Sequence, residues 1–346
     1  VQTGVAHTGV VGLLKGQNAR PVIMLRFDMD ALPLMEENEV AYVSRTPGQM
    51  HACGHDAHMA IGLGVATLLA RHRDALQGTV KLVFQPGEEG MNGAEVMVEQ
   101  GVLENPRPDV FLACHVWNDA PVGQVGITKG PIMAAAEKWT CKIVGSGGHG
   151  AMPHQTTDPV IAATQIINAM QTIVSRNVSP LDTAVVSVGS IHGGNAFNII
   201  PAQVILEGTI RTYAPATREI VLQRMQDLIA HTATAYGAEA GLTITPLTPA
   251  TINDARVTDL VIAAARDVLG EEQVLSDIRT MGSEDAAFFM QEIPGCYIFV
   301  GSGNANQGLD APHHNPHFDF DEEALVVGVA LMMKAVDRCL AEAFLP

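Results

Sequence analysis

The sequence has little basic charge, few cysteines and no long apolar run. Its 346 residues include 20 lysines and arginines against 37 aspartates and glutamates, a formal charge of −17. Such a surface repels a phosphate backbone, so we do not expect a nucleic-acid partner. No run of 18 apolar residues and no basic-then-apolar leader occurs, although the chain begins at Val1 rather than Met. We therefore expect neither a membrane span nor a signal peptide.

The five cysteines are an odd number, scattered through a chain too large to depend on disulfides. They stand at positions 53, 114, 141, 296 and 339. Reduced thiols and a cytoplasmic location are the natural interpretation.

Two common catalytic motifs are missing, and a third is misleading. There is neither a Gly-Lys-Ser/Thr phosphate loop nor a Gly-x-Ser-x-Gly nucleophile elbow. Residues 145–150, Gly-Ser-Gly-Gly-His-Gly, match a dinucleotide-binding spacing after a strand. However, Pro153 follows, and the next helical pattern starts only near Asp158. Because the pyrophosphate needs a helix N-terminus at that turn, we reject dinucleotide binding.

What is present is enough apolar sequence to fill cores. Hydrophobic residues make up 47% and charged residues 16% of the chain, without low-complexity segments or internal repeats. We therefore expect it to fold throughout. Its length exceeds one typical domain, so two domains, or one interrupted by another, are expected.

The first and last parts of the chain alternate apolar runs with helical patterns. Strands are predicted at 21–27, 79–85, 109–114 and 296–300, and helices near 56–76, 256–269, 283–291 and 322–342. Uninterrupted Val/Leu/Ile/Phe runs joined by helices indicate strands buried on both faces of a mainly parallel sheet. Residues 1–132 and 248–346 therefore predict one discontinuous α/β domain, expected to be catalytic.

The middle of the chain follows a different order. Strand, helix, strand, strand, helix and strand follow one another within residues 133–247, the ferredoxin-like β-α-β-β-α-β order. We interpret this segment as a second domain inserted into the first.

Chemically useful residues follow the predicted strands of the first domain. Asp28 and Asp30 follow the first strand, and the pair Glu88 and Glu89 the second; His115, His313 and His314 come after later ones. In open parallel sheets, ligands bind at the carboxyl ends of the strands. Topology therefore predicts that these groups form one site.

A Cys-His cluster lies before an apolar helix, at residues 51–58. Cys53 and His55 offer a thiolate and an imidazole that an irregular turn can aim at one point, whereas His51 and His58 are not required as ligands. The full set of candidate ligands is Cys53, His55, Glu89, His115 and His314. Five ligands exceed the three of a single catalytic zinc and fit two metals about 3.5 to 4 Å apart that share a water.

The adjacent glutamates, Glu88 and Glu89, then divide the work. One binds metal, and the other stays free to accept a proton from the attacking water. The alternative is that the two glutamates form a solvated acidic turn without a catalytic role.

Taken together, these motifs resemble a known family of metal-dependent amidohydrolases, which includes aminoacylases, hippurate hydrolases, auxin-conjugate hydrolases and certain carboxypeptidases. The matching stretches run nearly end to end: RFDMDALP (26–33), MHACGHDAH (50–58), FQPGEEG (84–90), CHVW (114–117), GSGGHGAMPH (145–154), GGNAFNIIP (193–201), GTIRTY (208–213), MGSED (281–285) and HHNPHFDFDE (313–322).

The resemblance implies a role for each candidate residue. It implies that the metal ligands are Cys53, His55, Glu89, His115 and His314, with Glu88 as general base. His314 is preferred to its neighbour because Pro316 follows by two positions. Asp30 corresponds to a carboxylate that orients a metal-binding side chain. Asn198 and Arg211 resemble the pair that holds the substrate's carboxylate. The alternative to this role is that Arg211 is a surface residue and Asn198 caps a loop.

His149 lies in the inserted domain. Amide hydrolysis develops negative charge on the carbonyl oxygen, and a histidine can donate a hydrogen bond there. In relatives the corresponding residue reaches a neighbouring subunit's site, so the resemblance implies a homodimer formed through an inserted lid and dimerisation domain. Action within one chain and a plain surface histidine are the alternatives.

The expected activity is hydrolysis of N-acyl amino acids with two divalent ions: Zn²⁺, Mn²⁺, Co²⁺ or Ni²⁺. A carboxypeptidase or dipeptidase acting on short peptides is the alternative, and a non-catalytic metal-binding scaffold is a third. The chain departs from the family in three places: it starts after the usual first helical segment, Gly150 replaces a common Ala, and Ala286 replaces a common aromatic. The last two concern the acyl pocket.

Overall fold

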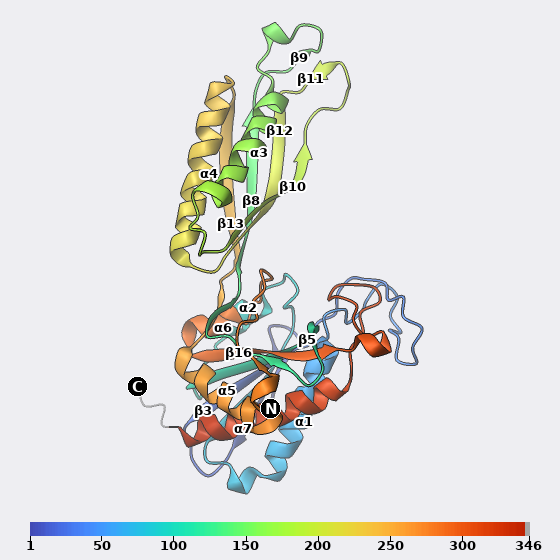
Figure 1. Cartoon of the computed structure of the whole chain (residues 1–346), viewed down its shortest axis with the longest axis vertical. Coiled ribbons are helices and arrows are strands. Elements are labelled where there is room, and N and C mark those ends of the chain that lie inside the picture. The colour runs from blue at the N-terminus through green and yellow to red at the C-terminus, as the bar shows by residue number, and fades with distance from the viewer. Residues whose placement is uncertain (343–346) are drawn as a thin grey trace. The chain divides into compact units, whose positions relative to one another are not determined.

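The computed structural model describes residues 1–342 as two compact units (Figure 1). The first unit comprises Val1–Ile132, Thr251–Arg279 and the segment from Glu284 onward, and the second comprises Met133–Ala250 with Thr280–Ser283. The sequence placed the second boundary at residue 247 and did not anticipate that Thr280–Ser283 packs with the middle segment.

An eight-stranded sheet forms the centre of the first unit, in the order β1-β2-β4-β3-β5-β16-β6-β15. Its four central strands, β4, β3, β5 and β16, pair in parallel. The strands are β1 (Gln2–Val5), β2 (Gly9–Lys15), β3 (Val22–Asp28), β4 (Thr79–Gln85), β5 (Val110–Pro121), β6 (Val125–Gly126), β15 (Val274–Leu275) and β16 (Gly295–Gly303). The prediction of a mixed α/β fold with a large, mainly parallel sheet is confirmed.

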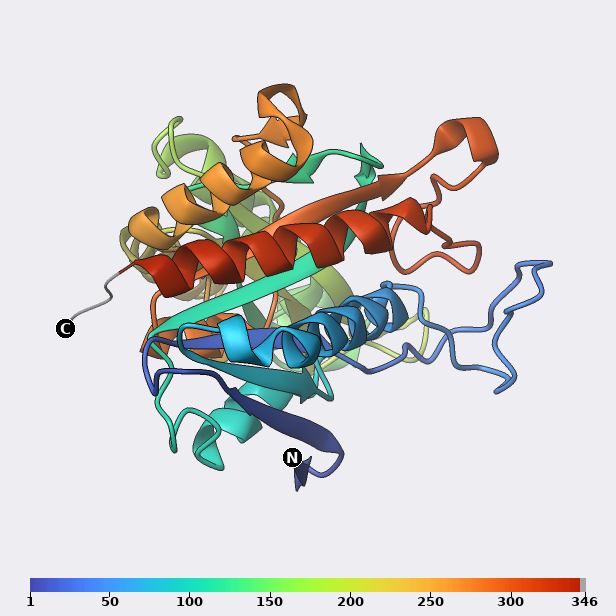
Figure 2. The same ribbon diagram turned by 90° about the horizontal axis from the view of Figure 1, so that it is seen from below.

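Helices cover both faces of this sheet. Figure 2 shows α1 (His55–Arg71), α7 (Glu323–Ala341) and α5 (Ala255–Leu269) side by side across one face. The shorter α2 (Gly93–Glu99) and α6 (Ala287–Glu292) contact each other away from these three helices. Every residue of β3 and β16 is buried, which explains why both strands are mostly apolar; the charged exceptions, Arg26 and Asp28, pair with each other.

Local signals set the ends of α5. The side chain of Asp254 accepts hydrogen bonds from the backbone N–H groups of Arg256 and Val257, which caps the first turn. Gly270, with φ +88°, ends the helix.

Three details correct the sequence interpretation. Strand β5 continues to Pro121, so His115 lies within it and not after it. Helix α6 begins only at Ala287, because the acidic side chains of Glu284 and Asp285 are engaged in buried contacts described below. The antiparallel strands β1 and β2, which extend the sheet beyond β4, were not predicted.

The second unit contains a four-stranded antiparallel sheet in the order β10-β12-β8-β13. Helices α3 (Pro159–Arg176) and α4 (Pro215–Ala235) pack on one of its faces around the buried Trp139. The strands are β8 (Ala135–Val144), β10 (Ala184–His192), β12 (Gln203–Thr212) and β13 (Glu239–Thr248). Along the chain the order is β8-α3-β10-β12-α4-β13.

Two small pairs of strands complete the fold. Within the second unit, β9 (Gly148–His149) pairs with β11 (Ile199–Ile200). The strands β7 (Gly130–Met133) and β14 (Thr251–Asn253) form the other pair. Within residues 1–342, no helix has the length and apolar character to cross a membrane.

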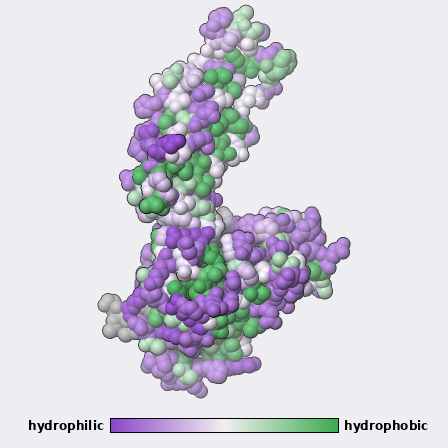
Figure 3. Space-filling view, in the orientation of Figure 1, coloured by the Kyte–Doolittle hydropathy of each residue, from purple (hydrophilic) through white to green (hydrophobic). Residues whose placement is uncertain are grey.

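Apolar side chains are exposed on the second unit, where Figure 3 shows them among polar surface. Ile161 and Val174 on α3 are 48% and 38% exposed, and Ile191 on the edge strand β10 is 49% exposed. An unpaired strand edge beside exposed apolar side chains is typical of surfaces that bind another chain.

Candidate metal centre

The five predicted ligands gather in the first unit although they come from four separate stretches of sequence. Possible ligand atoms of Cys53, His55 and His115 lie within 4.8 Å of one another. The same holds for Cys53, Glu89 and His314. Cys53 is common to both groups, so the geometry offers two adjoining positions with mixed sulfur, nitrogen and oxygen donors.

The turn that carries Cys53 and His55 depends on Gly54. This residue has φ +81°, a conformation that L side chains rarely adopt, and a Cβ there would lie 2.3 Å from Val116 Cγ2. Helix α1 starts directly at His55. The glycine therefore lets the chain turn sharply against β5 and brings the thiol and the imidazole on either side of it together.

His55 is oriented by Asp30, which follows β3. Its Nδ1 lies 3.0 Å from the backbone oxygen of Asp30 and 3.2 Å from Oδ1, so Nδ1 carries the proton and donates. The other nitrogen, Nε2, is buried without a hydrogen-bond partner. Burial lowers the pKa of His55, but the carboxylates of Asp28 and Asp30 outweigh it and raise the pKa to about 9. This position therefore attracts positive charge.

His115 is also held with one nitrogen available. Its Nδ1 lies 2.6 Å from the carbonyl oxygen of Val116, and its Nε2 lies 3.5 Å from Cys53 Sγ. Burial, together with the nearby rings of His58 and His313, lowers the pKa of His115 well below its ordinary value. A neutral imidazole with a free Nε2 is the form that binds a metal ion.

His314 lies at the opposite side of Cys53, with Nε2 3.1 Å from Glu89 Oε1. Its φ is +64°, uncommon for a residue other than glycine. The neighbouring His313 points elsewhere: its ring stacks on Trp117 at 4.9 Å and packs on Phe318 at 4.8 Å. The two histidines therefore differ in environment, and only His314 joins a possible ligand group.

The paired glutamates after β4 also differ. The backbone N–H of Glu89 donates to Asp30 Oδ2 at 2.9 Å, so Asp30 contacts two of the predicted ligands. Glu88 points toward Glu284 and Asp285, with carboxylate oxygens of the three within 4.8 Å of one another. Burial, followed by the charges of Glu284 and Asp285, raises the pKa of Glu88 well above its ordinary value.

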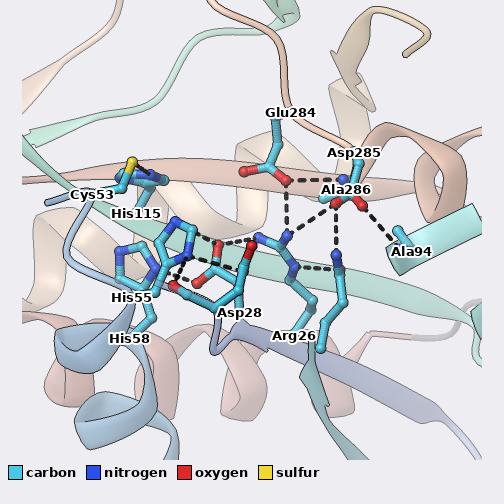
Figure 4. A network of polar contacts seen from close by, with 12 residues as sticks. Arg26, Asp28, Cys53, His55, His58, Ala94, His115, Glu284, Asp285 and Ala286 are labelled. Atoms are coloured by element: carbon cyan, nitrogen blue, oxygen red, sulfur yellow. Dashed lines mark hydrogen bonds and ion pairs between the residues drawn. The ribbon is translucent and has the colours of Figure 1, made fainter. Parts of the chain in front are cut away.

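Beneath these groups lies a buried ionic network that sequence reasoning missed. Arg26, 1% exposed, contacts Asp28 at 2.8 Å, Glu284 at 2.9 Å and Asp285 at 3.2 Å (Figure 4). Asp285 also accepts a hydrogen bond from the backbone of Ala94 at the start of α2. One guanidinium thus faces three carboxylates. The sequence did contain one sign of this network. Arg26 and Asp28 lie two residues apart, and so on one face, in a strand that is otherwise apolar.

His58 belongs to this network. The backbone N–H of Val116 donates to its Nε2 at 2.9 Å, so Nδ1 carries the proton and donates to Asp28 Oδ1. With both nitrogens engaged, His58 has none left for a metal ion. Burial works to raise the pKa of Asp28. The positive charge of Arg26, the nearby His55 and the hydrogen bond from His58 outweigh burial and hold this pKa well below its ordinary value.

The donor set fits a pair of divalent cations. The buried Nε2 of His55 makes no hydrogen bond and lies 3.5 Å from Asp28 Oδ2. Burial with the carboxylates of Glu89 and Glu88 raises the pKa of Cys53, so a cation is needed to hold its thiolate. Thiolate and imidazole favour zinc-like ions, and carboxylates favour harder ones. The arrangement therefore suits several divalent metals.

The second unit contains the other three predicted residues. His149 is exposed in β9, directly opposite Ile199 of β11, and Gly150 N–H donates to the backbone oxygen of Asn198 at 2.8 Å. His149 and Asn198 therefore lie on the same small two-stranded element. The backbone N–H of Ala151 donates to His149 Nδ1 at 3.1 Å. In the neutral ring the proton is then on Nε2, which leaves that nitrogen as a donor.

Arg211 lies apart from this element in the secondary structure, on β12 of the main sheet, opposite Val185 and Ala136. Its Nη1 donates to Thr209 Oγ1 at 2.7 Å, and none of the ion pairs among residues 1–342 involves it. Burial lowers its pKa from the ordinary value. A half-buried guanidinium without a carboxylate partner is suited to bind an anion.

Comparison with known proteins identifies the family. The profile of Peptidase family M20/M25/M40 matches residues 24–338. The chain belongs to this family. The resemblance to metal-dependent amidohydrolases drawn from the motifs is thus confirmed, and the protein is a hydrolase.

Its relatives in the M20 family include amide hydrolases from plants and bacteria. The chain is 41% identical to IAA-amino acid hydrolase ILR1-like 4 of Arabidopsis thaliana over 98% of its length and 77% of the relative's. It is 39% identical to N-acetyl-L-cysteine deacetylase of Bacillus subtilis, over 96% and 78% of the two chains. The crystal structure of a dinuclear metal-binding M20 peptidase from Bacillus subtilis superimposes with a TM-score of 0.83 at 33% identity, over 97% and 86%.

Proposed function

We propose that the protein hydrolyses the amide bond of N-acyl amino acids with two divalent metal ions. The observation that carries the proposal is the convergence of five ligand-type side chains into two adjoining groups that share Cys53, with Glu88 beside them. The metal ligands proposed are Cys53, His55, Glu89, His115 and His314. The names of the relatives, which include an IAA-amino acid hydrolase and an N-acetyl-L-cysteine deacetylase, support an N-acyl amino acid as substrate.

When bound, the two ions supply Lewis acidity, which polarises the substrate's carbonyl and lowers the pKa of a water molecule. Glu88 accepts the proton of that water and passes it to the leaving nitrogen, because it stands beside the ligands without being one of them. Asp30 orients His55 through Nδ1 and fixes the backbone of Glu89.

The residues of the second unit complete the site in this proposal. His149 donates from Nε2 to the carbonyl oxygen, where negative charge develops during the reaction. Arg211 and Asn198 hold the free carboxylate of the amino acid. The exposed position of His149 and the donor state of its Nε2 support its role.

We further propose that the second unit is a ferredoxin-like lid and dimerisation domain, and that residues 1–132 and 248–346 are the catalytic domain. The element order β8-α3-β10-β12-α4-β13 supports the first part. The edge strand β10 supports a homodimer, and so do the exposed apolar side chains of this unit, Ile161, Val174 and Ile191. The five free cysteines favour a reducing compartment such as the cytoplasm.

The test is a substrate panel with metal-loaded protein. N-acetyl amino acids, hippurate, indole-acetyl amino acids and dipeptides would be incubated with enzyme reconstituted with Zn²⁺, Mn²⁺, Co²⁺ or Ni²⁺, and the released amine measured. The control is Glu88→Gln, which keeps side-chain size. We expect turnover of N-acyl amino acids by the wild type alone. Faster turnover of dipeptides would favour the carboxypeptidase alternative, for which one relative is named Thermostable carboxypeptidase 2. No turnover by protein that holds two metal equivalents would refute the proposal.

A further inference from the structure

The side chain of Asn118, near the end of β5, joins three segments of the first unit. It is 8% exposed. Its Nδ2 donates to the backbone oxygens of Ala311 at 2.9 Å and of Asp319 at 2.8 Å. Its Oδ1 accepts a hydrogen bond from Ser302 Oγ at 2.7 Å, on the last part of β16. Both amide N–H groups and the amide oxygen are therefore engaged.

The two acceptors of Asn118 flank the loop that carries His314. Ala311 precedes His313 and His314, and Asp319 follows them, so one amide group fastens the loop at both ends. The backbone N–H of Asn118 also lies 3.4 Å from Nε2 of His313, inside the loop. Because Asn118 shares β5 with His115, this contact ties one proposed ligand's strand to the loop of another.

The loop needs such support because His314 is in a costly conformation. A residue other than glycine with positive φ is strained, and this conformation persists where the surrounding contacts determine it. One further contact is close by: the backbone N–H of His314 donates to the oxygen of Ala52 at 2.7 Å. Asn118 fixes the ends of the loop, and Ala52 fixes its middle.

We propose that Asn118 is a positioning residue for His314, and that it thereby sets the affinity for the metal ion that Cys53, Glu89 and His314 would hold. The inference rests on the proposed ligand set. Asn118 contacts neither a ligand atom nor substrate, so its effect passes through the loop. Side chains that orient metal ligands without binding the metal typically change its affinity by about 10- to 100-fold when replaced.

The same unit contains a matched control, Asn253. This residue is 2% exposed, its Nδ2 donates to the backbone oxygens of Thr128 at 2.8 Å and Tyr297 at 3.0 Å, and its Oδ1 accepts from the Tyr297 N–H at 2.7 Å. Asn118→Asp and Asn253→Asp therefore make the same chemical change. In each variant a carboxylate oxygen takes the place of the Nδ2 amide group, so two donated hydrogen bonds are lost and the new oxygen faces two backbone carbonyl oxygens. The two sites are similarly buried.

The experiment titrates metal-free protein with Mn²⁺ and measures the free ion by its electron paramagnetic resonance signal. Thermal unfolding is recorded in parallel. We expect both variants to lose thermal stability. Only Asn118→Asp should bind one of two Mn²⁺ equivalents about 10- to 100-fold more weakly than the wild type. Asn253→Asp should keep both wild-type dissociation constants.

Two results would overturn the inference. One is an Asn118→Asp protein with both dissociation constants unchanged; the other is an equal loss of Mn²⁺ affinity in the two variants. A wild type that binds fewer than two equivalents would instead overturn the proposed metal pair itself. If Asn118→Asp does not fold, Ser302→Ala replaces it, because loss of this hydroxyl removes the hydrogen bond that holds Oδ1 of Asn118 without adding charge. Weaker binding of one of the two Mn²⁺ equivalents by this variant would then support the inference, and unchanged dissociation constants would refute it.

Discussion

Replacing Arg26 tests whether the buried network holds the first unit together. Arg26→Met keeps the length of the side chain but removes the guanidinium that contacts the three carboxylates of Asp28, Glu284 and Asp285. Removing one partner of a buried ion pair typically costs about 3 to 5 kcal/mol, because the remaining charge is left uncompensated. For a domain of this size, that corresponds to a decrease in Tm of roughly 10 °C.

The effect should depend on pH in a definite direction. In the wild type, the pKa of Asp28 is held low although burial works to raise it, with Arg26 as the largest opposing influence. In Arg26→Met this influence is gone, so the folded-state pKa of Asp28 rises above its value in the wild type. The variant therefore loses stability, relative to the wild type, as pH rises through the folded-state pKa of its Asp28. The difference between wild type and variant should therefore be larger at pH 8 than at pH 5.

The assay is urea unfolding of metal-free protein at several pH values, read from Trp117 in a Trp139→Phe background. The chain has two tryptophans, and Trp139 belongs to the second unit, so Trp117 alone reports on the first. Arg20→Met is the control, because Arg20 is a mostly exposed partner of Asp109 and should cost no more than about 1 kcal/mol. A loss below about 1 kcal/mol in Arg26→Met, or an equal loss at pH 5 and pH 8, would contradict this reasoning.

Three further predictions concern catalysis. Glu88→Gln should keep its metal and lower kcat by about 100-fold or more, whereas Glu89→Gln should lose metal; elemental analysis with the opposite pattern would exchange the two roles. Arg211→Ala should raise KM about 10- to 100-fold for substrates with a free carboxylate and leave their methyl esters little changed, and equal damage to acids and esters would remove Arg211 from this role. His149→Ala and Glu88→Ala, each nearly inactive, should recover roughly a quarter of wild-type activity after subunit exchange, because half the dimers are mixed and each has one intact site. Confirmed exchange without recovery would exclude action of His149 in a neighbouring subunit.

The central strands could be predicted because burial on both faces leaves a clear signal. Residues 79–85 are strand β4 as predicted, and β3 is shifted by one residue from its predicted range. The edge strand β1 and its neighbour β2 were missed because β1 is short and largely exposed, and β2 is only partly buried and is interrupted by Gly12. Sequence periodicity reports burial, and an edge strand lacks much of it.

The candidate ligands could be named from sequence because cysteine, histidine and paired glutamates are unusual at the ends of strands. The buried ionic network around Arg26 could not be predicted. Arg26 contacts Glu284 across 258 positions, and nothing local to either residue indicates the pairing. The closeness of His149 and Asn198 was equally hidden, because it depends on β9 and β11, strands of two residues each. Such short strands carry no periodic pattern.

The discontinuous first unit imposes an order on the protein's own synthesis. When the ribosome has made residues 1–132, strand β5 exists, but its neighbour β16 follows only after residue 294. The main segment of the second unit, Met133–Ala250, is continuous and emerges in between. Four proposed ligands thus precede the second unit, and His314 follows it. A chain interrupted before residue 314 lacks one ligand and, if interrupted before residue 295, a central strand as well. With the proposed ligands, a complete metal pair can therefore form only after residue 314 has been made.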